Sequence, residues 1–155
     1  MFRKMRREDR ALTHEESEKI LTSATHGLLA VEGAEGYPYA VPISHVYANG
    51  KIYFHGAKTG QKLDAIANND KVCFTVVGGD EVKSSEFSTA YSSVIIFGQA
   101  RILEDAEEIR EACKNILQKF SPGYMNEGWE YVEKFLSHTA FVEIKVDHMT
   151  GKSNS

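Results

Sequence analysis

The segment Lys51–Phe74 constrains the fold of this chain more than any other part of the sequence. Lys51–His55 is rich in β-branched and aromatic residues, which favour a half-buried strand. The glycines of Gly56–Gly60 allow a tight turn, Gln61–Asn69 has apolar residues at helical spacing, and Val72–Phe74 is extended again. The segment therefore predicts a strand, a polar loop, a short helix and a second strand.

Two lysines, Lys58 and Lys62, lie in this loop and at the start of the short helix. Backbone N–H groups at a helix N-terminus form a favourable site for an anion, and nearby cations strengthen it. The segment therefore predicts a holder for a phosphate group. A solvated basic turn is the alternative, because the pattern by itself is not specific.

The rest of the chain predicts an antiparallel sheet with flanking helices. Asn49-Gly50 is the strongest hairpin signal and joins two of the strands. Pro38 and Pro42 place the first of these strands at a sheet edge or distort it, because proline donates no hydrogen bond to a neighbouring strand. Strands are expected at residues 26–31, 37–48, 51–55, 72–77, 91–103 and 140–146, and helices at 14–25, 61–69, 105–120 and 126–136. The expected fold class is α+β, mainly β, with the sheet closed into a small barrel.

Two further features concern the second half of the chain. Residues 78–89 are polar and are expected to be irregular, and Gly98 is expected to bend the long strand in which it lies. The strands at 72–77 and 91–103 carry apolar side chains on both faces, more than the interior of one small barrel can bury. Exposed apolar patches of that size mark an interface, so a homodimer is expected.

Composition limits the classes of protein to which the chain can belong. No linker divides the 155 residues, so residues 1–155 are expected to form a single domain, with residues 1–12 as a solvated basic arm. The chain has a net charge of −4, so it lacks the excess of basic residues that is typical of nucleic-acid-binding proteins. No apolar run approaches the roughly 20 residues of a membrane helix, and no signal peptide is visible. Cys73 and Cys113 lie in apolar segments, as reduced core cysteines do. A cytoplasmic protein without nucleic-acid or membrane partners is expected.

The sequence contains no recognisable metal or nucleophile motif. The six histidines include no pair at i, i+4 spacing, and neither cysteine has a second thiol nearby, so no metal site is expected. Nucleotide-binding fingerprints are missing as well. His55 leads directly into the glycine-containing loop, which makes it the candidate catalytic side chain. The alternative is that His55 packs on the rim of the barrel, with its imidazole bonded to a backbone carbonyl.

Four separated motifs, in the same order, resemble a known family. They are MRREDR, GYPYAVPISHVYANGKIYFHGAKTGQKLD, SSVIIFGQARI and VDHMTGK. The chain resembles the flavin-binding split-barrel family that includes pyridoxamine 5′-phosphate oxidase, and within it the nitroimidazole-resistance proteins. The resemblance implies a six-stranded Greek-key split barrel, and the tally of elements along the chain adds two to three flanking helices. It also implies a homodimer with FMN at the subunit interface.

The resemblance further implies which residues bind the cofactor. Lys62 stands where the family has a phosphate-binding lysine, and Gln61 where it often has arginine. Ser92 and Ser93 stand where the partner subunit reaches the cofactor. The other implied cofactor-binding residues are Val41, Pro42, Ile43 and Ser44 under the flavin ring, Phe54, His55 and Gly56 on the strand beside it, Ala57 and Lys58 in the loop, and His148, Gly151 and Lys152 in the closing motif.

Departures from the family pattern guide the expected activity. Ala40 and His45 stand where pyridoxamine phosphate oxidases have arginine and lysine, and their Arg- and Trp-containing substrate segment is missing. Oxidation of pyridoxamine phosphate is therefore not expected. The expected activity is FMN-dependent reduction of small electron-poor substrates such as nitroaromatics, with His55 donating a proton or hydrogen bond. The alternatives are a haem-binding split barrel with His55 or His148 as axial ligand, and a flavin-binding protein without turnover.

Overall fold

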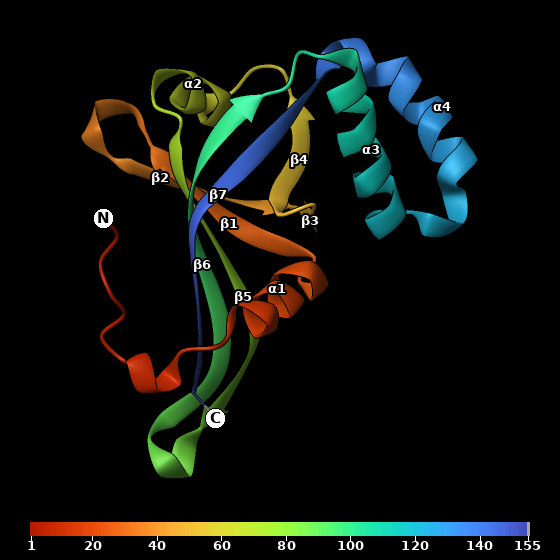
Figure 1. Ribbon diagram of the computed structural model, residues 1–155. Helices are drawn as coiled ribbons and strands as arrows, with labels where there is room; N and C mark the ends of the chain where they lie inside the picture. Colours follow the sequence, from red (N-terminus) through yellow and green to blue (C-terminus); the bar gives the residue numbers. More distant parts are fainter. Residues whose placement is uncertain (155) are drawn as a thin grey trace.

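The computed structural model describes residues 1–154 and confirms the expected α+β class (Figure 1). These residues contain four α-helices, namely α1 (His14–Ser23), α2 (Gln61–Asn68), α3 (Ala106–Phe120) and α4 (Met125–Phe135). The strands are β1 (His26–Glu32), β2 (Pro38–Ser44), β3 (Val46–Ala48), β4 (Lys51–Ala57), β5 (Lys71–Lys83), β6 (Ser88–Ile102) and β7 (Thr139–Asn154). All four helices expected from their residue ranges are present, so the expected count of two to three flanking helices was too low.

The strands form one antiparallel sheet in the order β2-β1-β5-β6-β7-β4-β3. The expected number of six strands is wrong, because the segment 37–48 is divided at His45 into β2 and β3. Across the described residues the sheet is not closed by hydrogen bonds, since β2 and β3 are its two edges. These edges are consecutive in the chain, so the sheet curls until they meet at His45.

Buried polar contacts hold the break at His45 in place. The imidazole is fully buried, and its Nε2 donates a hydrogen bond of 2.9 Å to the carbonyl of Leu21 in α1. The ammonium group of Lys119 in α3 donates to the backbone carbonyls of Ala24 and His45. Burial lowers the pKa of His45 to about 4, so the ring is neutral near pH 7. Both helices are thereby anchored to the point where β2 ends and β3 begins.

The hairpin at Asn49-Gly50 is confirmed, and both residues have the positive φ, 55° and 73°, that such a turn requires. It pairs β3 with β4 over three residues only. On its other side β4 is paired with β7 along its whole length, from Lys51 opposite Lys145 to Ala57 opposite Thr139. The strands expected at 37–48 and 51–55 therefore pair only next to the turn, and residues 41–44 pair with β1 because the chain leaves the ladder at the break. The edge position expected from the prolines of β2 is confirmed.

The long strands β5 and β6 depart from expectation in one place and follow it in another. Residues 78–89 are not irregular but extend both strands into a hairpin that projects from the body of the sheet (Figure 1). The expected distortion at Gly98 is present as a register shift between Phe97 and Gly98. A side chain at Gly98 would collide with the backbone carbonyl of Lys145, which explains why glycine stands there.

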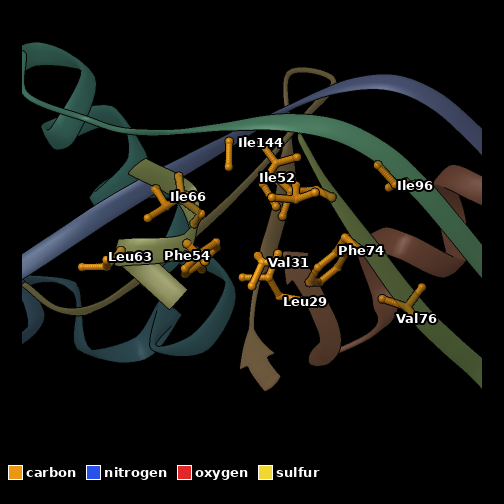
Figure 2. Packing of buried hydrophobic residues seen from close by; sticks show 14 of the residues in the cluster. Leu29, Val31, Ile52, Phe54, Leu63, Ile66, Phe74, Val76, Ile96 and Ile144 are labelled. Atoms are coloured by element: carbon orange, nitrogen blue, oxygen red, sulfur yellow. The ribbon is translucent and has the colours of Figure 1, made fainter. Parts of the chain in front are cut away.

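One apolar cluster fills the inside of the curled sheet (Figure 2). Its most deeply buried side chains, each 0 or 1% exposed, include Leu29, Ile52, Phe54, Phe74, Ile96 and Ile144. α2 adds Leu63 and Ile66 to the same cluster. Full burial of such a side chain contributes about 1.5–3 kcal/mol, so packing holds α2 against this cluster, where the helix contacts β1 and β6. A second cluster joins α3 to the outer side of β4 and β7 through Tyr53, Phe141, Cys113 and Ile116.

The N-terminal segment lies against the sheet and is not wholly solvated. The ring of Phe2 stacks on His148 and on Phe97, with centroid separations of 4.7 and 5.6 Å. The backbone N–H of Leu12 donates to the carbonyl of Gly151. The basic arm therefore covers part of the outer face of β6 and β7.

Candidate functional site

The loop between β4 and α2 brings the ammonium group of Lys62 against the backbone of Gly56. A Cβ atom added at Gly56 would lie 3.6 Å from both Cε and Nζ of Lys62. Glycine at this position therefore leaves open space beside the lysine. Among the described residues, no side chain caps the start of α2, whose N-cap is Gly60 with φ 144°. The first N–H groups of α2 thus remain available to an anion.

The charges around this loop favour an anion. Lys58 and Gln61 are exposed, and Lys62 is half-buried. Asp64 is the acidic residue in the first turn of α2, and it is exposed as well. The loop therefore combines two cations, one amide side chain and uncapped backbone donors around the residues for which the sequence predicts a phosphate holder. This geometry can hold a phosphate monoester.

His55 precedes Gly56 on β4 and faces the outer side of the sheet. Its ring stacks on Phe141 of β7, with centroids 5.9 Å apart and the planes inclined by 29°. One side of the ring is exposed, yet burial of the remainder lowers the pKa of His55 from its ordinary value. The structure gives the imidazole no hydrogen bond to any residue within 1–154, so its N–H group is available to a ligand. The alternative in which the imidazole of His55 is hydrogen-bonded to a backbone carbonyl is therefore wrong.

A cavity of about 470 Å³ opens beside His55, between the sheet and the pair of helices α3 and α4. Ser44 and His55, from the ends of β2 and β4, are the predicted site residues that line it. Aromatic and aliphatic side chains form most of its walls, among them Ile116, Phe120, Tyr131, Phe135 and Phe141. The sequence analysis missed the helical part of this wall. Exposed aromatic residues at helical spacing, Tyr131 and Phe135, were the available signal, and their rings lie 4.7 Å apart.

The other predicted residues of β2 and β4 divide between core and surface. Phe54 is 1% exposed and packs inside the sheet, so only its backbone is available to a cofactor. Val41 and Ile43 pack against the same cluster. Pro42 is exposed, as is Ser44 at the cavity. Because β2 and β4 are not paired, these residues lie on either side of the break in the sheet.

The remaining predicted residues lie away from the phosphate loop, in the second half of β7 and on the part of β6 that pairs with it. Ser93 pairs with Lys152, whereas Gly56, beside Lys62, pairs with Ala140. Lys152 lies twelve positions after Ala140 on β7, which corresponds to roughly 40 Å of extended strand. A single chain therefore does not bring Ser92, Ser93, His148, Gly151 and Lys152 together with the loop.

Local surroundings in this part of the sheet distinguish the five residues. A side chain at Gly151 would collide with Ser17 of α1, so this glycine is buried beneath the helix. Nζ of Lys152 lies 5.7 Å from the centre of the Tyr91 ring. A hydrogen bond from Lys152, with a further contribution from Arg10, lowers the pKa of Tyr91. The sequence analysis did not assign Tyr91 or Arg10, whose proximity depends on the packing of the N-terminal segment on β6.

Two classes of feature are missing from the part of the chain that is described. Residues 1–154 include no group of three or more histidine, cysteine, aspartate or glutamate side chains that could hold a metal ion. None of their helices is long and apolar enough to cross a membrane.

Comparison with known proteins gives one family and several similar folds. The family described as "Pyridoxamine 5'-phosphate oxidase" matches residues 13–153. No protein among those with curated descriptions matches. A crystal structure of a proposed 5-nitroimidazole antibiotic resistance protein from Bacteroides thetaiotaomicron is 24% identical, with a TM-score of 0.75, over 92% of this chain and 86% of that chain.

Two further structures come from proteins described as binding flavin. An FAD-binding protein from Mesorhizobium loti is 22% identical, with a TM-score of 0.67, over 94% of this chain and 98% of that chain. A protein from Mycobacterium smegmatis, described as binding FAD and heme, is 22% identical, with a TM-score of 0.81, over 96% of this chain and 74% of that chain. At these identities the similarity establishes the fold.

Proposed function

The chain belongs to the pyridoxamine 5′-phosphate oxidase family, and from this premise we propose that it binds FMN and reduces small electron-poor substrates such as nitroaromatics. The observation that carries the proposal is the loop at Gly56, where the Lys62 ammonium group meets the uncapped start of α2. The terminal phosphate of FMN is a dianion near neutral pH. A cation together with backbone N–H donors, as at this loop, binds such a group favourably. The curled sheet, with its edges joined at His45, supports the split barrel of this family.

In this proposal the residues of the chain bind and orient, and the flavin supplies the electrons. Lys62, Lys58, Gln61 and the first amides of α2 hold the phosphate. His55 is neutral near pH 7 because burial lowers its pKa, so its N–H group donates a hydrogen bond to the substrate. A nitro group that takes up two electrons and two protons becomes a nitroso group and releases water. The cavity beside His55 is the proposed place for the substrate.

The proposal includes a homodimer, because the predicted site is divided between the two ends of β7. A two-fold axis that sets the Lys152 end of one copy beside the Lys62 loop of the other would assemble all the predicted residues. The outer face of the sheet supports this arrangement. Its exposed apolar side chains include Leu28, Val77, Ile95 and Phe97, and an apolar face of this kind is suited to an interface.

The surroundings of His45 argue against oxidation of pyridoxamine phosphate. His45 stands where family oxidases carry a cationic residue on the first flavin strand, and its ring is fully buried and bonded to Leu21. The His45 ring therefore cannot also reach a cofactor at the surface.

One observation supports the haem alternative, namely the similarity of this fold to that of a protein described as binding FAD and heme. Of its two candidate ligands, His148 is already stacked on Phe2.

An absorption spectrum followed by a titration tests the proposal. Purified protein should show flavin bands at about 370 and about 450 nm and no haem band. Titration of the apoprotein should show much tighter binding of FMN than of riboflavin, which lacks the phosphate. Equal affinity for the two ligands would remove the support for the loop at Gly56, and a haem band in place of flavin would favour the alternative.

A further inference from the structure

The cavity beside His55 has a lining that the phosphate loop does not explain. Its volume of about 470 Å³ falls within the range of small-molecule sites. None of the described residues that line it is aspartate, glutamate, lysine or arginine. Phe120, Tyr131 and Phe135 close it on the side of the helices, and Phe141 forms the floor on β7. Such walls favour contact with a flat, apolar ring.

The titratable groups in the wall are neutral as well. Burial raises the pKa of Cys113 to about 11, so its thiol stays protonated near pH 7. Burial lowers the pKa of His55, which keeps the imidazole uncharged. The hydroxyl of Thr139 donates to the carbonyl of Phe135 and is therefore already bonded. The hydroxyls of Ser44, Ser121 and Tyr131 and the N–H group of His55 remain as polar partners for a ligand.

We propose that this cavity selects uncharged aromatic substrates and excludes anionic substrates of the same size. The inference rests on the proposed function, because it assigns the substrate class of the same site. A carboxylate that entered would lose part of its hydration and would meet no cation in the lining. The phosphate loop at Lys62 has the opposite preference. In this proposal the loop at Lys62 binds the anionic phosphate of the cofactor, and the cavity beside His55 binds the neutral substrate.

A matched pair of probes tests the selection directly. Para-nitrobenzyl alcohol and para-nitrobenzoate share the ring and the nitro group, and only the second is charged at neutral pH. The protein is loaded with FMN and reduced without oxygen, and the rate constant for reoxidation by each probe is measured. Binding is measured separately by quenching of Trp129, the single tryptophan of the chain, which lies on α4. Both measurements should favour the alcohol by about tenfold or more.

Two lysine substitutions, three residues apart on α3 and its C-cap, separate a local charge effect from a general one. Ser121 lines the cavity, whereas Gln118 is exposed and does not line it. Ser121→Lys should reduce the preference for the alcohol to about threefold or less, because the carboxylate would then have a cationic partner in the wall. Gln118→Lys adds the same charge and should leave the preference unchanged. Circular dichroism and FMN content confirm that both variants are folded and loaded.

The outcomes distinguish this inference from the proposed function. Saturable binding of the alcohol without reoxidation by it would support the cavity and contradict the reductase. Reoxidation by both probes at equal rates would support the reductase and overturn the selection. The inference is also wrong if Gln118→Lys alters the preference as much as Ser121→Lys, or if neither probe quenches Trp129 saturably.

Discussion

Replacing Lys62 with alanine should weaken the binding of FMN and leave the binding of riboflavin nearly unchanged. The Lys62 ammonium group lies beside Gly56, at the uncapped start of α2, where it would contact the phosphate. A hydrogen bond to a charged group contributes about 1.5–3 kcal/mol. Lys62 is half-buried, so solvent screens part of the attraction, and a loss of about 2 kcal/mol is reasonable. That loss corresponds to a roughly 30-fold increase in Kd.

Flavin fluorescence measures this change directly. Apoprotein is titrated with FMN and with riboflavin, for the wild type, for Lys62→Ala and for Lys114→Ala. Lys114 is an exposed residue of α3, so its substitution controls for the loss of one positive charge. An unchanged Kd for FMN in Lys62→Ala would refute the phosphate assignment. An equal loss of affinity for riboflavin would also refute it, because the effect would then come from the fold and not from the phosphate.

Three other predictions concern the substrate, stability and assembly. His55→Gln should keep FMN bound but lower the rate of nitro reduction by about tenfold or more. The wild-type rate should rise as pH drops through the lowered pKa of His55, because the imidazolium is a stronger donor than the neutral ring, and the variant should lack this rise. Wild-type turnover in the variant would make His55 structural. The folded-state pKa of His45, about 4 against 6.5 in the unfolded chain, should reduce the free energy of unfolding as pH falls from 6.5 to 4, by about 3 kcal/mol. Urea unfolding at a series of pH values should show this slope in the wild type and a smaller slope in His45→Gln. Sedimentation equilibrium at low micromolar concentration should show a dimer for the wild type and a monomer for Ile95→Lys, whose site is exposed on the apolar face; a folded, flavin-bound wild-type monomer would contradict the shared site.

Local sequence signals predicted the part of the site that local structure builds. The strand, loop and helix around Gly56 depend on residues close together in the chain, and the Asn49-Gly50 turn depends on two residues with positive φ. The break at His45 was not predictable in this way. It depends on contacts with Leu21 and Lys119, which are 24 and 74 residues away.

The cavity was missed for the same physical reason. Its walls combine β4 and β7 with α3 and α4, and the docking of these helices is set by packing across the whole second half of the chain. The hairpin at residues 78–89 was missed because its polar composition favours a loop, whereas the pairing of β5 with β6 carries the strands onward. Pairing across the hairpin thus overrode the preference of the individual residues.

The two edges of the sheet limit how copies of this protein can associate. β3 has only three residues, and β2 carries prolines at positions 38 and 42, four residues apart, so that both missing N–H groups lie on one side of the strand. Short or proline-bearing edges are poor templates for the addition of a strand from another molecule. Growth of the sheet into a continuous fibre is thereby disfavoured at both ends. Association through side chains, such as those on the outer face of the sheet, is not limited by these edges and can end at two copies.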